Sequence, residues 1–221
     1  MDALMNDPRF ASTTIAVIDF EGLTPAGRPA EPIEVAVLTL RPEAGRLVET
    51  GRFEELIRPP ADVPVTAMDV QLKGITARML AEKAPASEVM ARLDAGLTEP
   101  PYRLVAHHAS TEAGIIARQA KHCPVLATIP VLDTVRLAKA VVPGLGRYRL
   151  DHLLAYYSIP RPVGRHRAMP DVEVTAQLLE RLLEEGAAKG HWRSLLELDM
   201  AAGLQPRRPS APPEEDQPCL F

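Results

Sequence analysis

The sequence predicts an α/β domain whose central sheet is flanked by helices. Three apolar runs rich in branched side chains come first, at residues 15–20, 33–40 and 47–57, and their short connections favour an antiparallel meander of strands. Later in the chain, short apolar runs alternate with segments of helical spacing. Strands followed by mixed strands and helices are typical of a three-layer α/β or α+β domain.

The second half of the chain is expected to be mostly helical. Expected helices cover 75–82, 86–97, 111–121, 134–141, 149–157, 171–185 and 191–202, expected strands cover 103–106 and 129–133, and a loop rich in Pro, Gly and Arg covers 159–170. The helix from Asp171 has the clearest pattern, because its apolar side chains recur every three or four residues on one face. Pro170 and the acidic residues after it are typical of a helix start.

Composition limits the class of protein. The 221 residues are 46% hydrophobic, which is enough for one sizeable core, but only 4% aromatic, so the core must consist of Leu, Val, Ile and Ala. The net charge is −4, so the chain lacks the generic basic coat of many nucleic-acid-binding proteins. A carboxylate-lined metal site would contribute negative charge of its own, so a nucleic-acid enzyme is not excluded.

The chain is expected to divide into three parts. Residues 1–12 form an N-terminal extension, residues 13–203 form the folded domain, and residues 204–221 form a tail with five prolines. The tail holds too little apolar surface to offset the entropy of ordering, so it is predicted to be disordered.

The expected location is the cytoplasm. The first residues have neither a basic start nor an apolar core, so we expect no signal peptide. No stretch approaches 18 apolar residues, so we expect no membrane span. Two distant cysteines, Cys123 and Cys219, indicate neither a disulfide framework nor a zinc site.

An acidic pair ends the first expected strand. Asp19 and Glu21 are two residues apart, so both side chains point to the same face of the sheet. Carboxylates at the end of an apolar strand are costly unless something positive lies beside them. The alternative is that the strand end is simply exposed to solvent.

Two further clusters carry candidate functional groups. Residues 104–112 run from an apolar strand into a helix start, with Glu112 in the first turn, where it could merely complement the helix dipole. In residues 164–171, His166 lies in the loop and Asp171 opens the long helix. The ordinary alternatives are a surface histidine and an acid that caps the helix.

The order and spacing of these clusters resemble the DEDDh 3′→5′ exonucleases, the family of the DNA polymerase III epsilon proofreading subunit. The Asp-x-Glu motif of that family is matched by residues 19–21, Ala-His-Asn-Ala-x-Phe-Asp loosely by residues 106–112, and His-x-Ala-x-x-Asp by residues 166–171. Asp133-Thr134 followed by Leu137-Ala138 is similar to a connecting segment of the family, and the resemblance covers roughly residues 13–185. It implies a ribonuclease H-like three-layer α/β fold, with a mixed five-stranded sheet of three antiparallel strands followed by parallel strands, flanked by helices.

The second motif departs from the family pattern at three positions. Glu112 stands where the family usually has Asp, Thr111 replaces a Phe, and His108 replaces an Asn. Glu keeps the carboxylate but reaches one methylene further, and Mg²⁺ demands stricter geometry than Mn²⁺. We therefore expect an active site that favours Mn²⁺.

The resemblance also implies a two-metal mechanism with Mg²⁺ or Mn²⁺. The implied metal ligands, also counted as catalytic, are Asp19, Glu21, Glu112 and Asp171. Four converging carboxylates repel one another unless cations neutralise them. His166 lies five residues before Asp171, as in the DEDDh subclass, and is expected to take a proton from the attacking water, releasing a nucleoside 5′-monophosphate.

Five residues are expected near the substrate. Gly22 and Leu23, after the first strand, would receive the 3′-terminal nucleotide. Arg165 and Arg167 flank the catalytic histidine and would contact phosphates, the alternative being a solvated loop. His107 is expected beside the substrate, as a structural residue rather than a metal ligand.

The tail carries a possible partner motif. Gln217, Leu220 and Phe221 resemble the Gln-x-x-Leu-Phe peptide by which bacterial polymerase-associated proteins bind the sliding clamp. An extended peptide of this kind would place two apolar anchors in a groove.

Three functions remain open from the sequence. The first is a DNA 3′→5′ exonuclease in proofreading or repair, with the sliding clamp and a DNA polymerase as partners. The second is an exoribonuclease resembling oligoribonuclease or ribonuclease T, and the third is a catalytically weak module that docks on the clamp or polymerase. The tail favours DNA, whereas only the change at Glu112 supports the third function.

Overall fold

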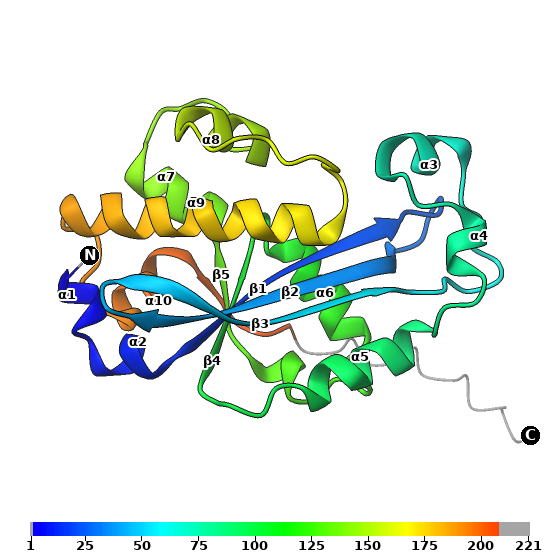
Figure 1. Cartoon of the computed structure of the whole chain (residues 1–221), viewed down its shortest axis with the longest axis horizontal. Coiled ribbons are helices and arrows are strands. Elements are labelled where there is room, and N and C mark those ends of the chain that lie inside the picture. Colours follow the sequence, from blue (N-terminus) through cyan, green and yellow to red (C-terminus); the bar gives the residue numbers. More distant parts are fainter. Residues whose placement is uncertain (1, 208–221) are drawn as a thin grey trace, which may run out of the picture.

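The computed structural model describes residues 2–207, and a mixed six-stranded sheet forms its centre (Figure 1). The strand order is β3-β2-β1-β4-β5-β6. The strands are β1 (Thr14–Leu23), β2 (Glu31–Glu43), β3 (Arg46–Leu56), β4 (Tyr102–Ala106), β5 (Val131–Asp133) and β6 (Gly203–Leu204). The first three are antiparallel, β4 and β5 run parallel to β1, and β6 returns antiparallel to β5. The mixed α/β sheet is confirmed, with one strand more than expected, because a two-residue strand has no periodicity to detect.

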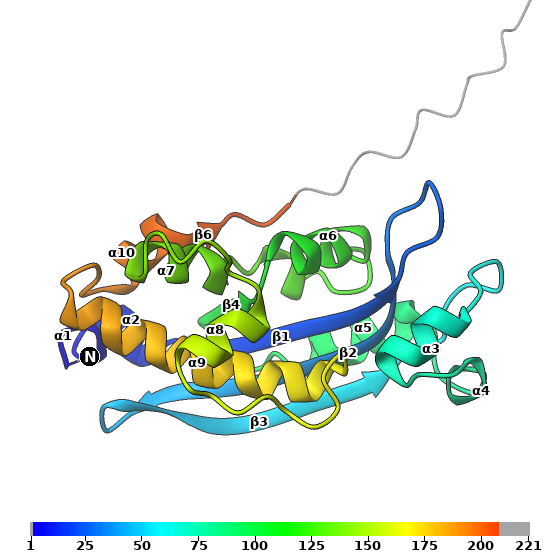
Figure 2. The same ribbon diagram turned by 90° about the horizontal axis from the view of Figure 1, so that it is seen from above.

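Helices cover both faces of this sheet, as Figures 1 and 2 show. The helical segments are α1 (Asp2–Met5), α2 (Pro8–Ser12), α3 (Ala67–Lys73), α4 (Ala77–Leu80), α5 (Ala86–Ala95), α6 (Ser110–Arg118), η1 (Leu126–Thr128), α7 (Thr134–Val141), α8 (Leu150–Tyr156), α9 (Ala168–Ala188) and α10 (Leu195–Ala202). Within this described part, no helix is long and apolar enough to cross a membrane.

Strand β1 separates two hydrophobic cores. Ile15 and Val17 belong to the core beneath α7 and α9, whereas Ala16 and Ile18 belong to the core with α5 and α6. Alternate side chains of a strand point to opposite faces, so this division defines three layers. By the same alternation, Asp19 continues the face that α9 covers.

The first twelve residues are more than an extension. Leu4 in α1 and Phe10 in α2 are buried in the core beneath α9. Asp7 caps α2 and also accepts a hydrogen bond of 2.8 Å from the backbone N–H of Leu195. The cap between the two short helices interrupts any helical period, which is why the sequence pattern did not indicate them. At the other end, Leu204 lies in β6, and the tail from residue 208 lies outside the described residues.

Helix α3 was missed between the third strand and the expected helix at 75–82. Thr66 and Asp69 form a reciprocal capping box at its start, and Gly74 ends it in the left-handed conformation. Only residues 77–80 of the next expected helix are helical. Seven residues are too few to show a helical spacing of apolar side chains, so only the capping residues could have predicted this helix.

The C-terminal end of α9 is anchored by Trp192. This side chain is fully buried, and its ring nitrogen donates a hydrogen bond of 3.2 Å to the carbonyl oxygen of Leu183. Gly186 provides the space for the ring, because a Cβ added there would lie 1.9 Å from a ring carbon. Such a contact is far inside van der Waals distance, so one of the two groups would have to move.

We predict that Gly186→Ala destabilises the fold by about 3 kcal/mol, the upper part of the usual range for overpacking. Urea unfolding followed by circular dichroism measures the change. Gly114→Ala in α6 is the control, because its added Cβ would meet only flexible arginine ends at 3.4 and 3.5 Å. That variant should be neutral or slightly more stable, and equal loss in both variants would contradict the packing argument.

Candidate active site

Asp19 and Glu21 lie side by side on the α9 face of β1. Both side chains are partly buried, and a register shift follows Glu21 in the pairing with β2. The regular hydrogen-bonding pattern between β1 and β2 therefore ends directly after the acidic pair.

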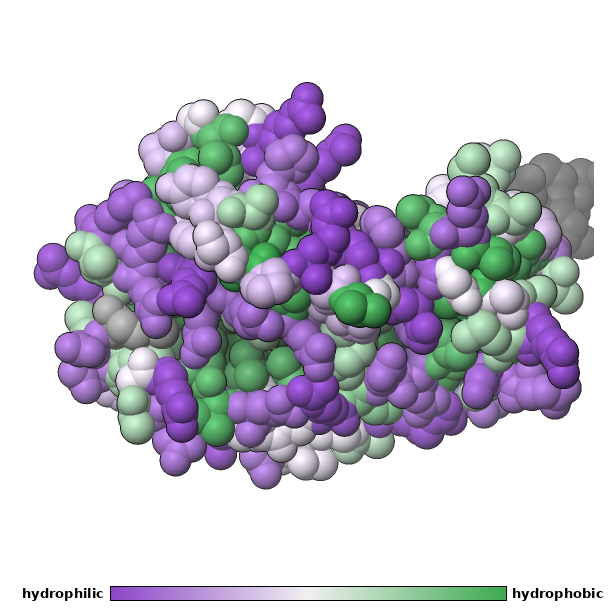
Figure 3. Space-filling model, turned by 45° about the horizontal axis from the view of Figure 1, so that its top comes forward, coloured by the Kyte–Doolittle hydropathy of each residue, from purple (hydrophilic) through white to green (hydrophobic). Residues whose placement is uncertain are grey.

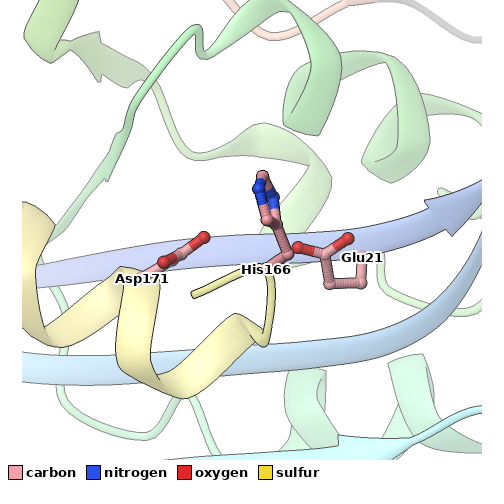
Figure 4. Close-up of side chains that lie close together, drawn as sticks. All are labelled: Glu21, His166 and Asp171. Atoms are coloured by element: carbon pink, nitrogen blue, oxygen red, sulfur yellow. The ribbon is translucent and has the colours of Figure 1, made fainter. Parts of the chain in front are cut away.

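Asp171 and His166 come from the start of α9 and the loop before it. Asp171 is buried in the first helical turn, whereas His166 is partly exposed and has a left-handed backbone with φ of 69°. Ligand atoms of Glu21, His166 and Asp171 all lie within 4.8 Å of one another. Figure 4 shows the three side chains gathered over β1, with Asp171 and Glu21 on either side of His166.

Glu112 completes the cluster from the other side of β1. It lies in the first turn of α6, directly after β4, and is 4% exposed. Burial, and then the charges of Asp133 and Glu21, raise its pKa to about 8. The position predicted from the family motif therefore holds a buried carboxyl group close to the other acids.

The pKa of Asp19 reports the convergence of all four acids. Burial raises this pKa well above its usual value, and the charges of Glu112, Glu21 and Asp171 raise it further. Burial also raises the pKa of Glu21 to about 7 and that of Asp171 to about 6. Lys73 and Arg165 oppose these shifts but do not cancel them. The protein thus holds four carboxyl groups together at a cost in free energy.

The residues present fit divalent cations. Glu112 Oε2 and Asp171 Oδ1 are buried and have no hydrogen-bond partner within residues 2–207. Buried polar atoms are normally paired, so two orphan carboxylate oxygens in one acidic cluster need another partner. Oxygen ligands are those that Mg²⁺ and Mn²⁺ prefer.

The two arginines of the loop are held by carboxylates. Arg165 Nε donates a hydrogen bond of 2.9 Å to Asp151, and its guanidinium also pairs with Asp171. Arg167 Nε lies 2.9 Å from Glu34 Oε1. Their predicted contact with substrate phosphates stays a prediction, but in this structure both side chains position the loop that carries His166.

Glu34 is a functional residue that the sequence interpretation missed. It is fully buried on β2 and accepts hydrogen bonds from Arg167 and, at 2.8 Å, from the backbone N–H of Ala168 at the start of α9. The sequence did contain evidence for this residue. Side chains alternate along a strand, so Glu34 must lie on the same face of β2 as the buried Ala36 and Leu38. A charge in that register needs a partner.

The remaining predicted residues lie in different surroundings. Leu23 is buried with Ile33, so its side chain is part of the core and only its backbone is available for a nucleotide. Gly22 is partly buried, and a Cβ there would come within 3.3 Å of the Glu31 carbonyl oxygen. The clamp-binding positions lie outside the described residues.

His107 is held as a neutral, structural side chain. Its Nδ1 lies 2.8 Å from Thr134 Oγ1, and burial lowers its pKa to about 3. Its Nε2 has no partner among the described residues. The ring meets that of His108 edge to face at 5.0 Å. No part of this arrangement tests the predicted substrate contact.

The surface of the molecule has a hollow. Figure 3 shows this hollow between the α8–α9 side of the molecule and the α3–α4 side, where hydrophobic side chains gather. Exposed Met68 and Leu72 on α3 and Met79 on α4 contribute to that apolar surface.

Comparison with known proteins gives the family. Residues 16–179 match the RNase_T family model, described as exonuclease, and this range contains every member of the acidic cluster. The chain belongs to the RNase_T exonuclease family. The exonuclease family expected from the sequence motifs is thereby confirmed.

The sequence relatives include proteins of DNA metabolism. The chain is 30% identical over 181 residues to DNA polymerase III PolC-type from Bacillus cereus, covering 81% of this chain and 12% of the polymerase. It is 30% identical over 187 residues to the 3′-5′ exonuclease DinG from Bacillus subtilis, covering 82% and 18%. The chain thus spans less than a fifth of the length of either relative.

Solved structures confirm the ribonuclease H-like fold. The nuclease domain of 3′hExo, a DEDDh family member bound to rAMP, has a TM-score of 0.67 at 19% identity, covering 81% of this chain and 95% of that domain. Exonuclease X in complex with 5′ overhanging duplex DNA has a TM-score of 0.61 at 22% identity, covering 78% and 93%. Identities this low establish the fold alone.

We predict that Arg167→Ala costs about 3–5 kcal/mol of stability, because it leaves the fully buried Glu34 carboxylate without its ion partner. Chemical unfolding measures this loss. Arg161→Ala is the control, since Arg161 is 64% exposed in its pair with Asp151 and should contribute less than about 1 kcal/mol. An Arg167→Ala variant with unchanged stability and a raised KM would instead support a phosphate-binding role for Arg167.

Proposed function

We propose that this domain is a metal-dependent 3′→5′ exonuclease that hydrolyses the terminal phosphodiester of DNA to release nucleoside 5′-monophosphates. The convergence of four carboxyl groups and His166 around one pair of orphan oxygens supports this proposal most directly. An unpaired or frayed 3′ end is the substrate, in replication proofreading or repair.

In this proposal the acidic side chains bind the metal ions. Asp19, Glu21 and Asp171 would hold divalent cations together with Glu112, whose second oxygen has no other use in the described structure. Two bound cations, Mg²⁺ or Mn²⁺, would supply Lewis-acid stabilisation of the scissile phosphate and lower the pKa of the attacking water.

His166 would accept the proton of the attacking water. Burial and the neighbouring Arg165 lower its pKa, so the ring is neutral at neutral pH and has a nitrogen free to accept a proton. It is partly exposed, which gives it access to solvent for releasing that proton. Its left-handed backbone sets the ring between Glu21 and Asp171.

The choice of DNA rests on the sequence relatives. PolC-type polymerase III is a DNA polymerase by its name, and DinG is named as a 3′-5′ exonuclease. RNA is the alternative substrate, because one structural neighbour recognises a histone mRNA stem-loop. A catalytically weak docking module is the other alternative, and it requires that Glu112 fail as a ligand.

The test is release of mononucleotides from 3′-labelled single-stranded DNA and RNA, with Mg²⁺ and with Mn²⁺. We expect faster release from DNA, abolished by EDTA, and at least about a 100-fold loss in Asp19→Ala. Faster release from RNA would favour the exoribonuclease. No release from either substrate with either metal would leave the docking module.

The residue at position 112 is predicted to set the metal preference. Glu112→Asp should raise the ratio of Mg²⁺-supported to Mn²⁺-supported kcat by about tenfold, because Mg²⁺ tolerates less distortion of its ligand geometry. Glu112→Gln, which keeps the length but lacks the charge, is the control and should lose activity with both metals. An unchanged ratio in Glu112→Asp would show that side-chain length does not matter here.

The tail is proposed to bind the sliding clamp through Gln217, Leu220 and Phe221, all outside the described residues. Deleting residues 217–221 should raise the Kd for purified bacterial clamp at least about tenfold, because two apolar anchors are removed. Surface plasmon resonance measures this affinity, and a scrambled five-residue tail is the control. Undiminished clamp binding by the deletion variant would refute the role, and hydrolysis of short DNA should be the same in all forms.

A further inference from the structure

A basic pocket opens next to the segment between β4 and α6. Its volume is about 600 Å³, and it is lined by His108, Val135, Lys139, Arg147, Tyr148 and Arg149. We call it the 139–149 pocket. The lining comes from the end of β4, from α7 and from the loop between α7 and α8. Three cationic side chains therefore meet around one open volume in a chain whose net charge is negative.

The cations of this pocket form no ion pair within the described residues. Lys139, Arg147 and Arg149 are exposed, and none has an ion-pair partner within residues 2–207. The arginines near His166 are different, because Arg165 and Arg167 are already paired with carboxylates. The positive charge available to an anionic ligand near the site thus lies in the 139–149 pocket.

The loop that carries the two arginines is fixed by Tyr148. The hydroxyl of Tyr148 donates a hydrogen bond of 2.8 Å to the carbonyl oxygen of Val142 and accepts one of 3.2 Å from the backbone N–H of Leu145. Lys139 Nζ lies 5.7 Å from the centre of the Tyr148 ring. An aromatic ring that is held in this way presents the cations from an ordered loop, which lowers the entropy lost on binding.

The pocket shares the segment between β4 and α6 with the acidic cluster. His108 lines it, and Glu112 follows one helical turn later. His107 lies near both the backbone of Tyr148 and the charge of Arg165. The pocket lies on the β4–β5 side of β1, whereas Gly22 pairs with β2 on the opposite side. A nucleic-acid strand that crosses the carboxylates would therefore have its 3′-terminal nucleotide on the β2 side of β1 and the rest of the strand on the β4–β5 side.

We propose that the 139–149 pocket binds the phosphodiester backbone of the substrate strand on the 5′ side of the scissile bond. This inference rests on the proposed 3′→5′ activity, because cleavage of the terminal bond leaves all remaining phosphates on the 5′ side. Cations without internal partners bind phosphates through charge and do not read the base. The pocket therefore supplies affinity for strand length, independently of sequence.

The test compares full-length wild-type protein with the triple variant Lys139→Ala/Arg147→Ala/Arg149→Ala. With a fluorescent single strand of about 12 nucleotides in EDTA, we expect Kd to rise at least about tenfold. The slope of log affinity against log salt should fall by about 2, since each phosphate contact on a single strand contributes about 0.7. With Mg²⁺ or Mn²⁺, KM for the long strand should rise while hydrolysis of a dinucleotide is unchanged.

The matched control is Arg9→Ala/Arg46→Ala/Lys121→Ala, which removes the same charge from exposed positions outside the pocket. An equal loss of affinity in the control would show a general charge effect and overturn the inference. Unchanged Kd, salt slope and KM in the pocket variant would also overturn the inference. The proposed exonuclease activity would still stand in that case if the wild-type protein cleaves both the long strand and the dinucleotide. Pocket-dependent binding without cleavage of either substrate would support the binding site and overturn the exonuclease activity.

Discussion

The buried ion pair between Glu34 and Arg167 is the constraint on which the site depends. A carboxylate with no exposure must be paired, and this one is satisfied by the guanidinium and by the backbone at the start of α9. The pair therefore joins β2 to the segment that carries His166 and Asp171. Because β2 is also paired with β1, the same sheet sets the position of Asp19 and Glu21. This one ion pair therefore fixes the position of His166 and Asp171 relative to Asp19 and Glu21.

The acidic cluster is stable only because the surrounding fold is rigid. Its members come from β1, α6 and α9, which belong to separate parts of the chain and pack through two different cores. Like charges in low-dielectric surroundings favour separation, and the raised pKa values of Glu112 and Asp19 reflect that tendency. The packing of both cores opposes this separation. Functional sites commonly retain such unfavourable electrostatics, because the ligand removes the cost when it binds.

The sequence was most informative where chemistry and regular spacing coincide. The three-layer order of strands and helices followed from apolar periods, and the acidic positions followed from motifs at fixed spacing. Glu34 was missed because its significance depends on Arg167, which is more than a hundred residues away. The 139–149 pocket was missed for another reason: its cations lie close together in sequence, but only the turn fixed by Tyr148 directs them to one volume. Local pattern could place single residues, but it could not show which charges are already neutralised.

Helix α9 makes the reaction centre sensitive to events at a distance. From Asp171 in its first turn to Gly186 beside the buried Trp192, this 21-residue helix rises about 22 Å. A rigid helix segment of that length converts a rotation of about 2.5° at one end into a displacement of about 1 Å at the other, enough to impair alignment for catalysis. The indole ring of Trp192 thus supports the end of the helix opposite to Asp171. Natural variation in the C-terminal packing of this domain can therefore tune turnover without altering any residue that touches the substrate.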